Sequence, residues 1–544
     1  MSEQEPLLKI SGLSVAFRSG SELVTAISDV DIDVAAGETV ALVGQSGSGK
    51  STTGAATNRL LPDNGVITGG SIRFDGKEIT DLGEHELIRL RGAGIGLVPQ
   101  DPMSNLDPVM RVGDQIAEAL EVHGYTSGAE TEKRAIELLD MVGIADAERR
   151  FRQYPHEFSG GMRQRVLIAI GLACRPRLLI ADEPTSALDV TVQRKVLDQL
   201  ESLTDELGTA VILITHDLAL AAERADRIVV MHNGRVVETG PSDQVLSHPE
   251  DDYTKELIAA APSLASKREL RPRAAAADER PAILVEATDL TKVFPVRAAK
   301  KNEPREFMAV DKVSFQIPAS STVSLVGESG SGKSTTANML LGLETITSGT
   351  ITFEGTDLTA LNKTELFSFR RKVQPVFQNP YSSLDPRYTI EQTIAEPMRV
   401  HGVGDKTSRR TRVLELLDQV ALPASMAERL PHELSGGQRQ RVAIARALAL
   451  NPELVVLDEA VSALDVLVQA QILKLLADLQ ADLGLSYLFI SHDLAVVRLI
   501  SDEVHVMQHG TIVESGTPEE LFEHPQHPYT QELLAAIPGR DIAA

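Results

Sequence analysis

The chain has 544 residues and an ordinary apolar content of 42%, so we expect it to fold, and its length exceeds the roughly 250–300 residues that one core can organise. Its formal net charge of −24 repels phosphate backbones and argues against a broad nucleic-acid interface. Cys174 is the only cysteine, which excludes an internal disulfide and any zinc or iron–sulfur site built from cysteines, and which fits a reducing cytoplasm.

The N-terminal residues 1–6 are acidic and polar and lack the basic-then-apolar pattern of a signal peptide. No stretch approaches the ~20 uncharged apolar residues of a membrane helix. The longest apolar runs, such as 178–181 and 454–457, have the length of strands. We therefore expect any role at a membrane to be peripheral.

A glycine-rich loop follows the apolar run 39–43. The loop, Gly44–Ser51, reads G-x-x-x-x-G-K-S, and residues 52–61 after it can form a helix. Strand, glycine-rich loop and helix are the context of a phosphate-binding P-loop, in which backbone N–H groups surround phosphate oxygens. We expect Lys50 to reach the β- and γ-phosphates and the Ser51 hydroxyl to hold Mg²⁺.

Strand and helix patterns lie on both sides of this loop. Residues 7–34 before it predict strands, because apolar and acidic side chains alternate in Val30–Val34. Residues 113–144 after it predict helices, because apolar residues such as Ile136 and Leu139 are spaced for one helix face. Strands that alternate with helices favour a largely parallel sheet covered on both faces.

Two carboxylates end the predicted strand 178–181. A P-loop fold needs a carboxylate at such a strand end to hold Mg²⁺ through its water shell, and Asp182 suits that role. Glu183 is placed to orient or deprotonate the attacking water. Two charged residues that merely open a helix are the alternative, but the neighbouring P-loop and the repetition of the pair favour the functional interpretation.

Each of these features occurs twice. The second P-loop, Gly327–Ser334, begins 283 residues after the first (327 − 44), and Asp458-Glu459 follows Asp182-Glu183 by 276 (458 − 182). Two long similar units indicate two homologous domains rather than a solenoid, whose periods are ~20–50 residues. Residues 266–282 are rich in Ala, Arg and Pro, so we predict a first domain at 1–265, a linker at 266–282 and a second domain at 283–544.

Several further motifs resemble those of ABC-transporter ATPases, twice and over nearly the whole chain. The signature motif is resembled by Ser159-Gly160-Gly161 and Ser435-Gly436-Gly437-Gln438, the D-loop by residues 186–189 and 462–465, the Q-loop by Gln100 and Gln378, and the switch histidine by His216 and His492. The resemblance implies an α/β fold of two tandem P-loop NTPase domains. Each domain is expected to have a RecA-like parallel-sheet core, an antiparallel β-subdomain and a helical subdomain.

The resemblance also implies a role for each matching residue. ATP is expected to contact Gly44, Gln45, Ser46, Gly47, Ser48, Gly49, Lys50, Ser51 and Thr52, their counterparts Gly327, Glu328, Ser329, Gly330, Ser331, Gly332, Lys333, Ser334 and Thr335, and the signature residues Ser159, Gly160, Gly161, Ser435, Gly436, Gly437 and Gln438. Magnesium is assigned to Ser51, Gln100, Asp182, Ser334, Gln378 and Asp458. Catalysis is assigned to Glu183, Glu459, His216, His492, Gln100 and Gln378. Phe17 and Phe294 either stack on adenine, as the first-strand aromatic of the family does, or belong to the core.

In this family two domains close head to tail on two ATP molecules. The implied pairing puts the first P-loop against Ser435–Gln438 and the second against Ser159–Met162. A Ser-Gly-Gly that opens a helix offers backbone N–H groups to a γ-phosphate. The departures between the halves are mild: Met162 in place of Gln, and Ala460-Val461 where the first half has Pro184-Thr185. Both sites are therefore expected to turn over, at rates that can differ.

Three details resemble the oligopeptide/dipeptide/nickel importer group. The first is residues 100–108 and 378–386, which begin with the Q-loop glutamines, and the second is the tail 527–538 with a looser copy at 248–262. The third is the opening 294–296, which resembles the second ATPase subunit of such importers, together with the signature segment 158–163, which resembles the first. The chain thus resembles a fusion of both subunits. Separate subunits of the group often carry a cysteine cluster that this chain lacks, which leaves the solute subgroup open.

The importer resemblance implies an ATPase that uses ATP and Mg²⁺ at the cytoplasmic face of the inner membrane. It would dock beneath two permease subunits, through a groove between the Q-loop segment and the helical middle, and an extracytoplasmic solute-binding protein would supply the solute. Peptides are the default solute, with nickel, glutathione-like molecules and opines as alternatives.

The main rival is a soluble tandem ABC ATPase that acts on ribosomes or DNA. Translation-type members carry a long charged linker and Asn-His before the D-loop Leu-Asp, whereas this chain has a short linker and Ser-Ala. A non-hydrolysing scaffold conflicts with two intact Glu/His pairs, and an exporter is less expected because no membrane span is fused to the chain.

Overall fold

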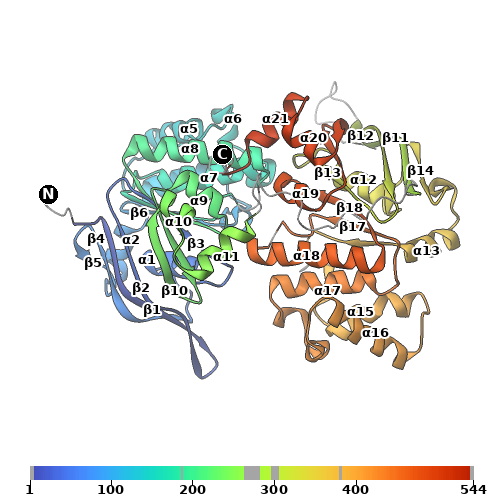
Figure 1. Ribbon diagram of the computed structural model, residues 1–544. Coiled ribbons are helices and arrows are strands. Elements are labelled where there is room, and N and C mark those ends of the chain that lie inside the picture. The colour runs from blue at the N-terminus through green and yellow to red at the C-terminus, as the bar shows by residue number, and fades with distance from the viewer. Residues whose placement is uncertain are drawn as a thin grey trace. The chain divides into compact units, whose positions relative to one another are not determined.

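The structure is a computed structural model that describes residues 5–185, 188–261, 282–295, 306–378, 383–462 and 464–539. Outside these ranges lie the predicted linker apart from Ala282, the D-loop residues Ser186, Ala187 and Ala463, Val296, and residues 379–382 after the second Q-loop glutamine. The described chain forms two compact units, the first running to Ala261 and the second comprising most of the later residues (Figure 1). The domain limits at 265 and 283 stay a prediction.

The first unit opens with an antiparallel sheet in the order β2-β1-β4-β5. Its strands are β1 (Leu8–Ser19), β2 (Glu22–Val34), β4 (Gly65–Phe74) and β5 (Lys77–Glu78). The alternation in β2 has the predicted effect: Val30 and Val34 are buried while Asp31 and Asp33 between them are exposed. One face of this sheet therefore supplies apolar side chains to the core.

The central sheet has the order β10-β9-β3-β8-β7-β6, and all its neighbours are parallel except β9 and β10. The strands are β3 (Thr39–Val43), β6 (Ile95–Val98), β7 (Leu178–Asp182), β8 (Ala210–Thr215), β9 (Arg227–His232) and β10 (Arg235–Pro241). Successive residues face opposite sides: Ile180 and Ile212 pack towards the antiparallel sheet, and Leu179 and Leu213 towards the helices. The continuous apolar runs are thus explained by a sheet that is covered on both faces.

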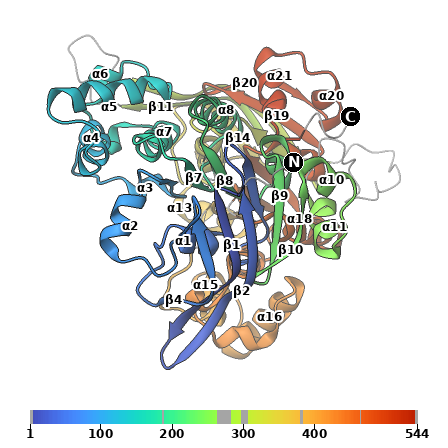
Figure 2. The ribbon, with the colours of Figure 1, turned by 90° about the vertical axis from the view of Figure 1, so that its left-hand side faces the viewer.

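Helices cover this sheet and form a separate helical group. They are α1 (Lys50–Thr57), α2 (Glu84–Leu90), α3 (Pro102–Asn105), α4 (Val112–Val122), α5 (Ala129–Met141), α6 (Ala147–Arg150), α7 (Gly160–Leu172), α8 (Val190–Leu207), α9 (Leu218–Arg224), α10 (Ser242–Ser247) and α11 (Asp252–Ala260). Within the first unit, Figure 2 shows α4, α5 and α6 on one side and α10 and α11 on the other, with strands of the central sheet between them. The helical middle predicted at 113–144 corresponds to α4 and α5.

The helix after the P-loop differs from its predicted range of 52–61. It begins at Lys50, directly after the left-handed Gly49, and ends at Thr57. Arg59 adopts a left-handed backbone with φ +53, which a helix cannot continue through, and Pro62 follows shortly after.

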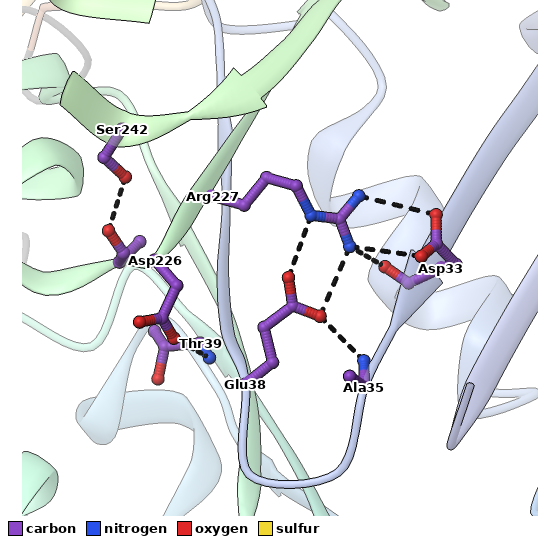
Figure 3. A network of polar contacts seen from close by, with 8 residues as sticks. Asp33, Ala35, Glu38, Thr39, Asp226, Arg227 and Ser242 are labelled. Atoms are coloured by element: carbon purple, nitrogen blue, oxygen red, sulfur yellow. Dashed lines mark hydrogen bonds and ion pairs between the residues drawn. The ribbon is translucent and has the colours of Figure 1, made fainter. Parts of the chain in front are cut away.

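A polar network joins the antiparallel sheet to the strand that carries the P-loop (Figure 3). Arg227 at the start of β9 donates through Nε to Oε1 of Glu38 at 2.8 Å and through Nη1 to Oδ1 of Asp33 at 3.4 Å. Asp226 beside it accepts from the backbone N–H of Thr39 at 2.9 Å. Because Thr39 begins β3, the network fixes the strand whose far end opens into the P-loop.

The second unit repeats this architecture. Its antiparallel sheet has the order β12-β11-β14-β15 and its central sheet β16-β17-β18-β13-β19-β20. The strands are β11 (Ile283–Pro295), β12 (Glu306–Pro318), β13 (Thr322–Val326), β14 (Ser348–Phe353), β15 (Thr356–Asp357), β16 (Val373–Val376), β17 (Leu454–Asp458), β18 (Ser486–Ser491), β19 (Glu503–Gln508) and β20 (Thr511–Gly516). The helices are α12 (Lys333–Leu340), α13 (Lys363–Lys372), α15 (Ile390–Val400), α16 (Lys406–Gln419), α17 (Gly436–Leu448), α18 (Val466–Leu483), α19 (Leu494–Ile500), α20 (Pro518–Glu523) and α21 (Pro528–Ala535).

Candidate functional site

Both glycine-rich loops lie between a strand and a helix, as predicted: 44–49 between β3 and α1, and 327–332 between β13 and α12. The first glycine of each loop passes very close to a neighbouring strand. A Cβ on Gly44 would lie 2.2 Å from the carbonyl oxygen of Met231, and one on Gly327 would lie 2.2 Å from that of Met507. Only glycine fits at either position.

The start of each helix after the loop is open to an anion. Gly49 and Gly332 precede α1 and α12 with no side chain to cap the first N–H groups. The first four N–H groups of a helix have no intrahelical partner, and the helix dipole adds positive potential there. The cradle therefore fits the phosphates of a nucleotide.

Lys50 turns back onto its own loop. Its Nζ donates to the carbonyl oxygens of Gly44 at 2.7 Å and Gln45 at 2.9 Å, and Lys333 makes the matching pair of bonds at 2.7 and 2.8 Å. Burial lowers the pKa of Lys50, an effect that the carboxylate of Glu183 partly offsets. A buried ammonium beside the loop is a strong partner for phosphate oxygens.

The predicted magnesium ligands meet at the end of β7 and of β17. The Ser51 hydroxyl donates to Oδ1 of Asp182 at 3.1 Å, and Ser334 makes the same contact to Asp458, also at 3.1 Å. Burial raises the pKa of Asp182, although the bond from Ser51 acts in the opposite direction. A hydroxyl and a partly desolvated carboxylate side by side are oxygen ligands of the kind that Mg²⁺ takes, so both sites fit the ion.

Glu183 lies between a glutamine and a histidine. Gln100 donates through Nε2 to Oε2 of Glu183 at 2.7 Å, and Nδ1 of His216 lies 3.2 Å from Oε1. Burial alone would raise the pKa of Glu183, but the hydrogen bond and charge of His216, helped by Lys50 and Gln100, outweigh it and lower that pKa. For His216 burial alone would lower the pKa, and Glu183 outweighs it and raises the pKa. The glutamate is thus held in its ionised form.

The second unit repeats this group. Gln378 donates through Nε2 to Oε2 of Glu459 at 2.7 Å, and Nδ1 of His492 lies 3.5 Å from Oε1 of Glu459. Burial would raise the pKa of Glu459, but His492 first and then Lys333 and Gln378 lower it. Glu183 and Glu459 both adopt positive φ, +44 and +47, with their N–H groups bonded to the neighbouring strand. The structure therefore brings together all the predicted Gln, Glu and His residues of each unit.

The Ser-Gly-Gly segments begin α7 and α17 and are not part of these contacts. Ser159 caps α7 by accepting from the N–H of Met162 at 3.4 Å, and Ser435 caps α17 by accepting from that of Gln438 at 3.3 Å. Gln438 also accepts from the N–H of Ser435 at 3.0 Å, which completes a capping box that Met162 cannot form. The mild departure at Met162 thus has a local structural consequence.

The two candidate adenine-stacking aromatics differ in their surroundings. Phe17 is partly buried and packs against the core of the first unit. Phe294 is also partly buried, but Nζ of Lys292 lies 4.8 Å from its ring centroid. Lys292 is itself paired with Glu344 at 2.6 Å. A cation on a ring face holds the ring in place, so the aromatic of the second unit is the more firmly positioned of the two.

One pair of residues at the loops has no role that the sequence predicts. The hydroxyl of Tyr253 accepts from the backbone N–H of Gln45 at 2.9 Å, and that of Tyr529 accepts from Glu328 at 3.0 Å. The available signal was the spacing, because the tyrosines are 276 residues apart (529 − 253), as are the two Asp-Glu pairs. In the sequence, the tail motif that contains them indicates a family and no contact with a P-loop.

Two family models match the chain. The ABC transporter model matches residues 27–186 and 310–462. The model of the oligopeptide/dipeptide transporter C-terminal region matches residues 237–287 and 513–543, which include both tyrosines. Within the described part of the chain, no helix has both the length and the apolar character that crossing a bilayer requires.

Curated relatives match this chain over almost its full length. The glutathione import ATP-binding protein GsiA of Salmonella choleraesuis (strain SC-B67) is 45% identical over 565 residues, which cover 99% of this chain and 90% of that protein. GsiA of Escherichia coli (strain K12) is 45% identical over 561 residues, covering 98% and 89%. A solved dimeric ATP-binding cassette, described as a post-hydrolysis state bound to ADP and Pi, is 32% identical with a TM-score of 0.40 and covers 43% of this chain and 98% of that one.

Proposed function

Because the chain belongs to the ABC transporter family of ATP-binding proteins, we propose that it is the ATP-hydrolysing subunit of a solute importer, with one hydrolytic site on each P-loop. The observation that carries this proposal is the repeated group of glutamine, glutamate and histidine beside a serine–aspartate pair. A scaffold that only binds nucleotide has no need of a half-buried, ionised glutamate in both halves.

In this proposal each P-loop binds the phosphates of ATP. The N–H groups at the start of α1 and α12 donate to phosphate oxygens. Lys50 and Lys333 release the carbonyl oxygens of their loops and donate to phosphate oxygens instead. Ser51 with Asp182, and Ser334 with Asp458, would hold Mg²⁺, together with Gln100 and Gln378 through their side-chain oxygens. The ion supplies charge neutralisation at the phosphates.

Glu183 and Glu459 act as the bases. Each carboxylate orients a water molecule and accepts its proton as the water attacks the γ-phosphate. Each carboxylate oxygen has more than one lone pair, so the bonds to Gln100 and His216 leave room for a water. Those bonds fix the direction of the Glu183 carboxylate, and positioning is most of what phosphoryl transfer needs.

The signature segments complete the sites in the closed state. We assign Ser435–Gln438 to the nucleotide of the first P-loop and Ser159–Met162 to that of the second, in a head-to-tail closure. The N–H groups at the start of α7 and α17 are suited to the γ-phosphate. Hydrolysis would remove that contact and release the closure.

Two membrane permeases are the proposed partners, docked on the groove between the Q-loop segment and the helical group. In the second unit a cavity of about 680 Å³ supports this placement, because it is lined by Gln378 and Phe377 on one side and by Glu396 and Pro397 of α15 on the other. Such docking puts the protein at the cytoplasmic face of the inner membrane. An extracytoplasmic solute-binding protein would deliver the solute to the permeases.

The proposed solute is a small peptide, with glutathione-like tripeptides as the leading candidates. The names of the relatives, each a glutathione import ATP-binding protein, and the match to the oligopeptide/dipeptide transporter C-terminal region support this class. The solute itself contacts other subunits, so residues of this chain do not select among peptides directly.

A capture experiment tests the importer assignment. The tagged Glu183→Gln/Glu459→Gln variant is incubated with Mg-ATP in gently solubilised native membranes, and its partners are identified by mass spectrometry. Co-purification of two multi-span permeases is the expected result. Ribosomal or DNA-repair partners without a permease would overturn the importer assignment and favour the soluble tandem ATPases that the sequence left as the rival.

A further inference from the structure

A tyrosine from the tail of each domain reaches back to the P-loop of the same unit. Tyr253 lies 208 residues after Gln45 and Tyr529 lies 201 residues after Glu328, yet each hydroxyl accepts the backbone N–H of that loop residue at 2.9 and 3.0 Å. Both tyrosines are buried, with exposures of 9% and 5%. The same long-range contact in two separate units indicates a regular feature of the fold rather than an accident of one loop.

The tail of the first unit is built to hold its tyrosine in place. Glu238 on β10 accepts the N–H groups of Glu250 at 2.8 Å and Asp251 at 3.1 Å. The side chain of Asp251 then caps α11 by accepting the N–H of Tyr253 at 2.8 Å. The ring also packs on His232 at the end of β9, with the centroids 3.9 Å apart. A strand, a helix cap and a ring contact thus fix the hydroxyl that meets the P-loop.

The second unit uses the same construction with different residues. Glu514 on β20 accepts the N–H groups of Gln526 at 2.7 Å and His527 at 3.1 Å. The imidazole Nδ1 of His527 replaces the aspartate as the cap of α21 and accepts the N–H of Tyr529 at 3.2 Å. The glutamate and the tyrosine recur in both units while the capping residue differs, so the hydroxyl contact does not depend on which residue caps the helix.

In each P-loop, two side chains hold the same residue: a tyrosine accepts its backbone N–H, and a lysine donates to its carbonyl oxygen. In the first loop Tyr253 holds the N–H of Gln45, and Nζ of Lys50 holds its carbonyl oxygen at 2.9 Å. When the lysine turns to a phosphate, it releases that carbonyl. The tyrosine bond does not depend on the phosphate, so it keeps this residue in place while the rest of the loop closes on the ligand.

We propose that Tyr253 and Tyr529 are positioning residues of the two nucleotide sites, which anchor the second residue of each P-loop so that the loop is already shaped for phosphate. The inference rests on the proposed function, since it assigns the tail segments to the ATP sites. A loop that is held in its binding shape loses less conformational freedom when the ligand binds. The tyrosines therefore act on nucleotide affinity and leave the chemical step to Glu183 and Glu459.

The test removes only the hydroxyls. Tyr253→Phe/Tyr529→Phe is compared with wild type for the KM and kcat of ATP hydrolysis and for ADP affinity by calorimetry. A net hydrogen bond of about 1 kcal/mol corresponds to roughly a fivefold change in affinity. We expect the KM for ATP and the Kd for ADP to rise roughly 3- to 10-fold, with kcat changed less than about twofold.

Tyr487→Phe is the matched control. Tyr487 is also buried, and its hydroxyl donates to the carbonyl oxygen of Leu476 at 2.9 Å. It pairs with Thr322 at the start of β13, at the opposite end of that strand from the P-loop. This variant should lose similar thermal stability with no change in KM or Kd.

Amide hydrogen exchange gives a second readout for each loop separately. Tyr253→Phe should speed exchange at the first P-loop roughly fivefold and leave the second unchanged, and Tyr529→Phe should do the reverse. If both variants lower the melting temperature as Tyr487→Phe does but leave exchange, KM and Kd at wild-type values, the inference is wrong. A wild-type chain that binds no ADP would overturn the proposed function itself, and the inference with it.

Discussion

The side-chain amide of Gln100 donates to Oε2 of Glu183 at 2.7 Å, although the two residues are 83 positions apart in the chain. Gln378 and Glu459 make the same bond at the same length. The glutamine that follows β6 or β16 is therefore attached to the glutamate that follows β7 or β17. If these glutamates are the bases and a permease docks beside the glutamines, as proposed, a displacement of either glutamine would move the base and so change the rate of hydrolysis.

Gln100→Glu/Gln378→Glu tests this attachment in both sites. The double variant replaces each donor by a second carboxylate, which repels Glu183 and Glu459 from their present positions. A general base contributes about 10²- to 10⁴-fold to a rate, so displacing it should lower kcat roughly 10-fold or more while ATP still binds. Steady-state ATPase assays measure this.

The matched control is Gln153→Glu, because Nε2 of Gln153 donates to Glu157 at 3.3 Å in an exposed position outside the site. This control should hydrolyse ATP at the wild-type rate. Equal kcat values for Gln100→Glu/Gln378→Glu and the wild type would show that the two bonds have no part in turnover.

The two glycines of the first signature segment should differ in their effect on stability. A Cβ at Gly161 would lie 2.5 Å from Cγ1 of Val192 on α8, whereas one at Gly160 would meet its nearest atom at 3.6 Å. Gly161→Ala should therefore cost about 1–3 kcal/mol through overpacking, and Gly160→Ala should cost nothing, since alanine favours the helix. Thermal melts of both variants check this, and equal melting temperatures would contradict it.

The buried imidazole of His505 should make the second unit less stable in acid. Burial lowers its pKa to about 4, with Nδ1 bonded to Ser515 at 2.7 Å and Glu503 lying 3.7 Å from Nε2. Between pH 6.5 and 4 the unfolded chain binds a proton here that the folded chain does not, so stability falls as the pH falls. The loss in the second unit should reach about 3 kcal/mol at pH 4.

The repeat supplies the variant that tests this. Val229 occupies the matching position of β9 (505 − 229 = 276), so His505→Val should fold and should lack this part of the acid sensitivity. Urea unfolding at several pH values between 7 and 4 measures the difference. If the free energy of unfolding depends on pH in the same way for both proteins, His505 does not cause the acid sensitivity.

Phe294 should contribute to nucleotide affinity in the second unit if it stacks on adenine. Phe294→Ala is expected to weaken binding roughly 10-fold, in line with about 1–3 kcal/mol for base–aromatic stacking. Binding is measured in a Lys50→Ala background so that the second site reports alone. Phe307→Ala is the control, because Phe307 lies opposite Phe294 in register and is 54% exposed. Lower stability without a change in affinity would mean that Phe294 belongs to the core.

The sequence predicted most of the site because its parts are local. A glycine-rich loop between a strand and a helix needs no tertiary information, and a carboxylate at the end of a buried strand is recognised from five or six residues. The convergence of Gln100, Glu183 and His216 follows from parallel strands, whose carboxyl ends meet at one edge of the sheet.

The contacts that could not be predicted depend on how distant segments pack. Tyr253 is in a surface-like tail pattern, and nothing in its neighbourhood points to a P-loop 208 residues earlier. The bond of Lys50 to its own loop carbonyls also escapes the motif, which describes the lysine only as a phosphate ligand. The end of α1 at Thr57 was missed because apolar spacing continues to Leu61 after the backbone has left the helix.

The measurement that tests the central claim most directly is ATP binding and ATP hydrolysis by Glu183→Gln/Glu459→Gln on the same preparation. If the two glutamates are the bases of two hydrolytic sites, the variant binds Mg-ATP with the affinity of the wild type and hydrolyses it roughly 10²- to 10⁴-fold more slowly. Undiminished hydrolysis by the double variant would contradict the assignment of both bases and, with it, the account of how the sites work.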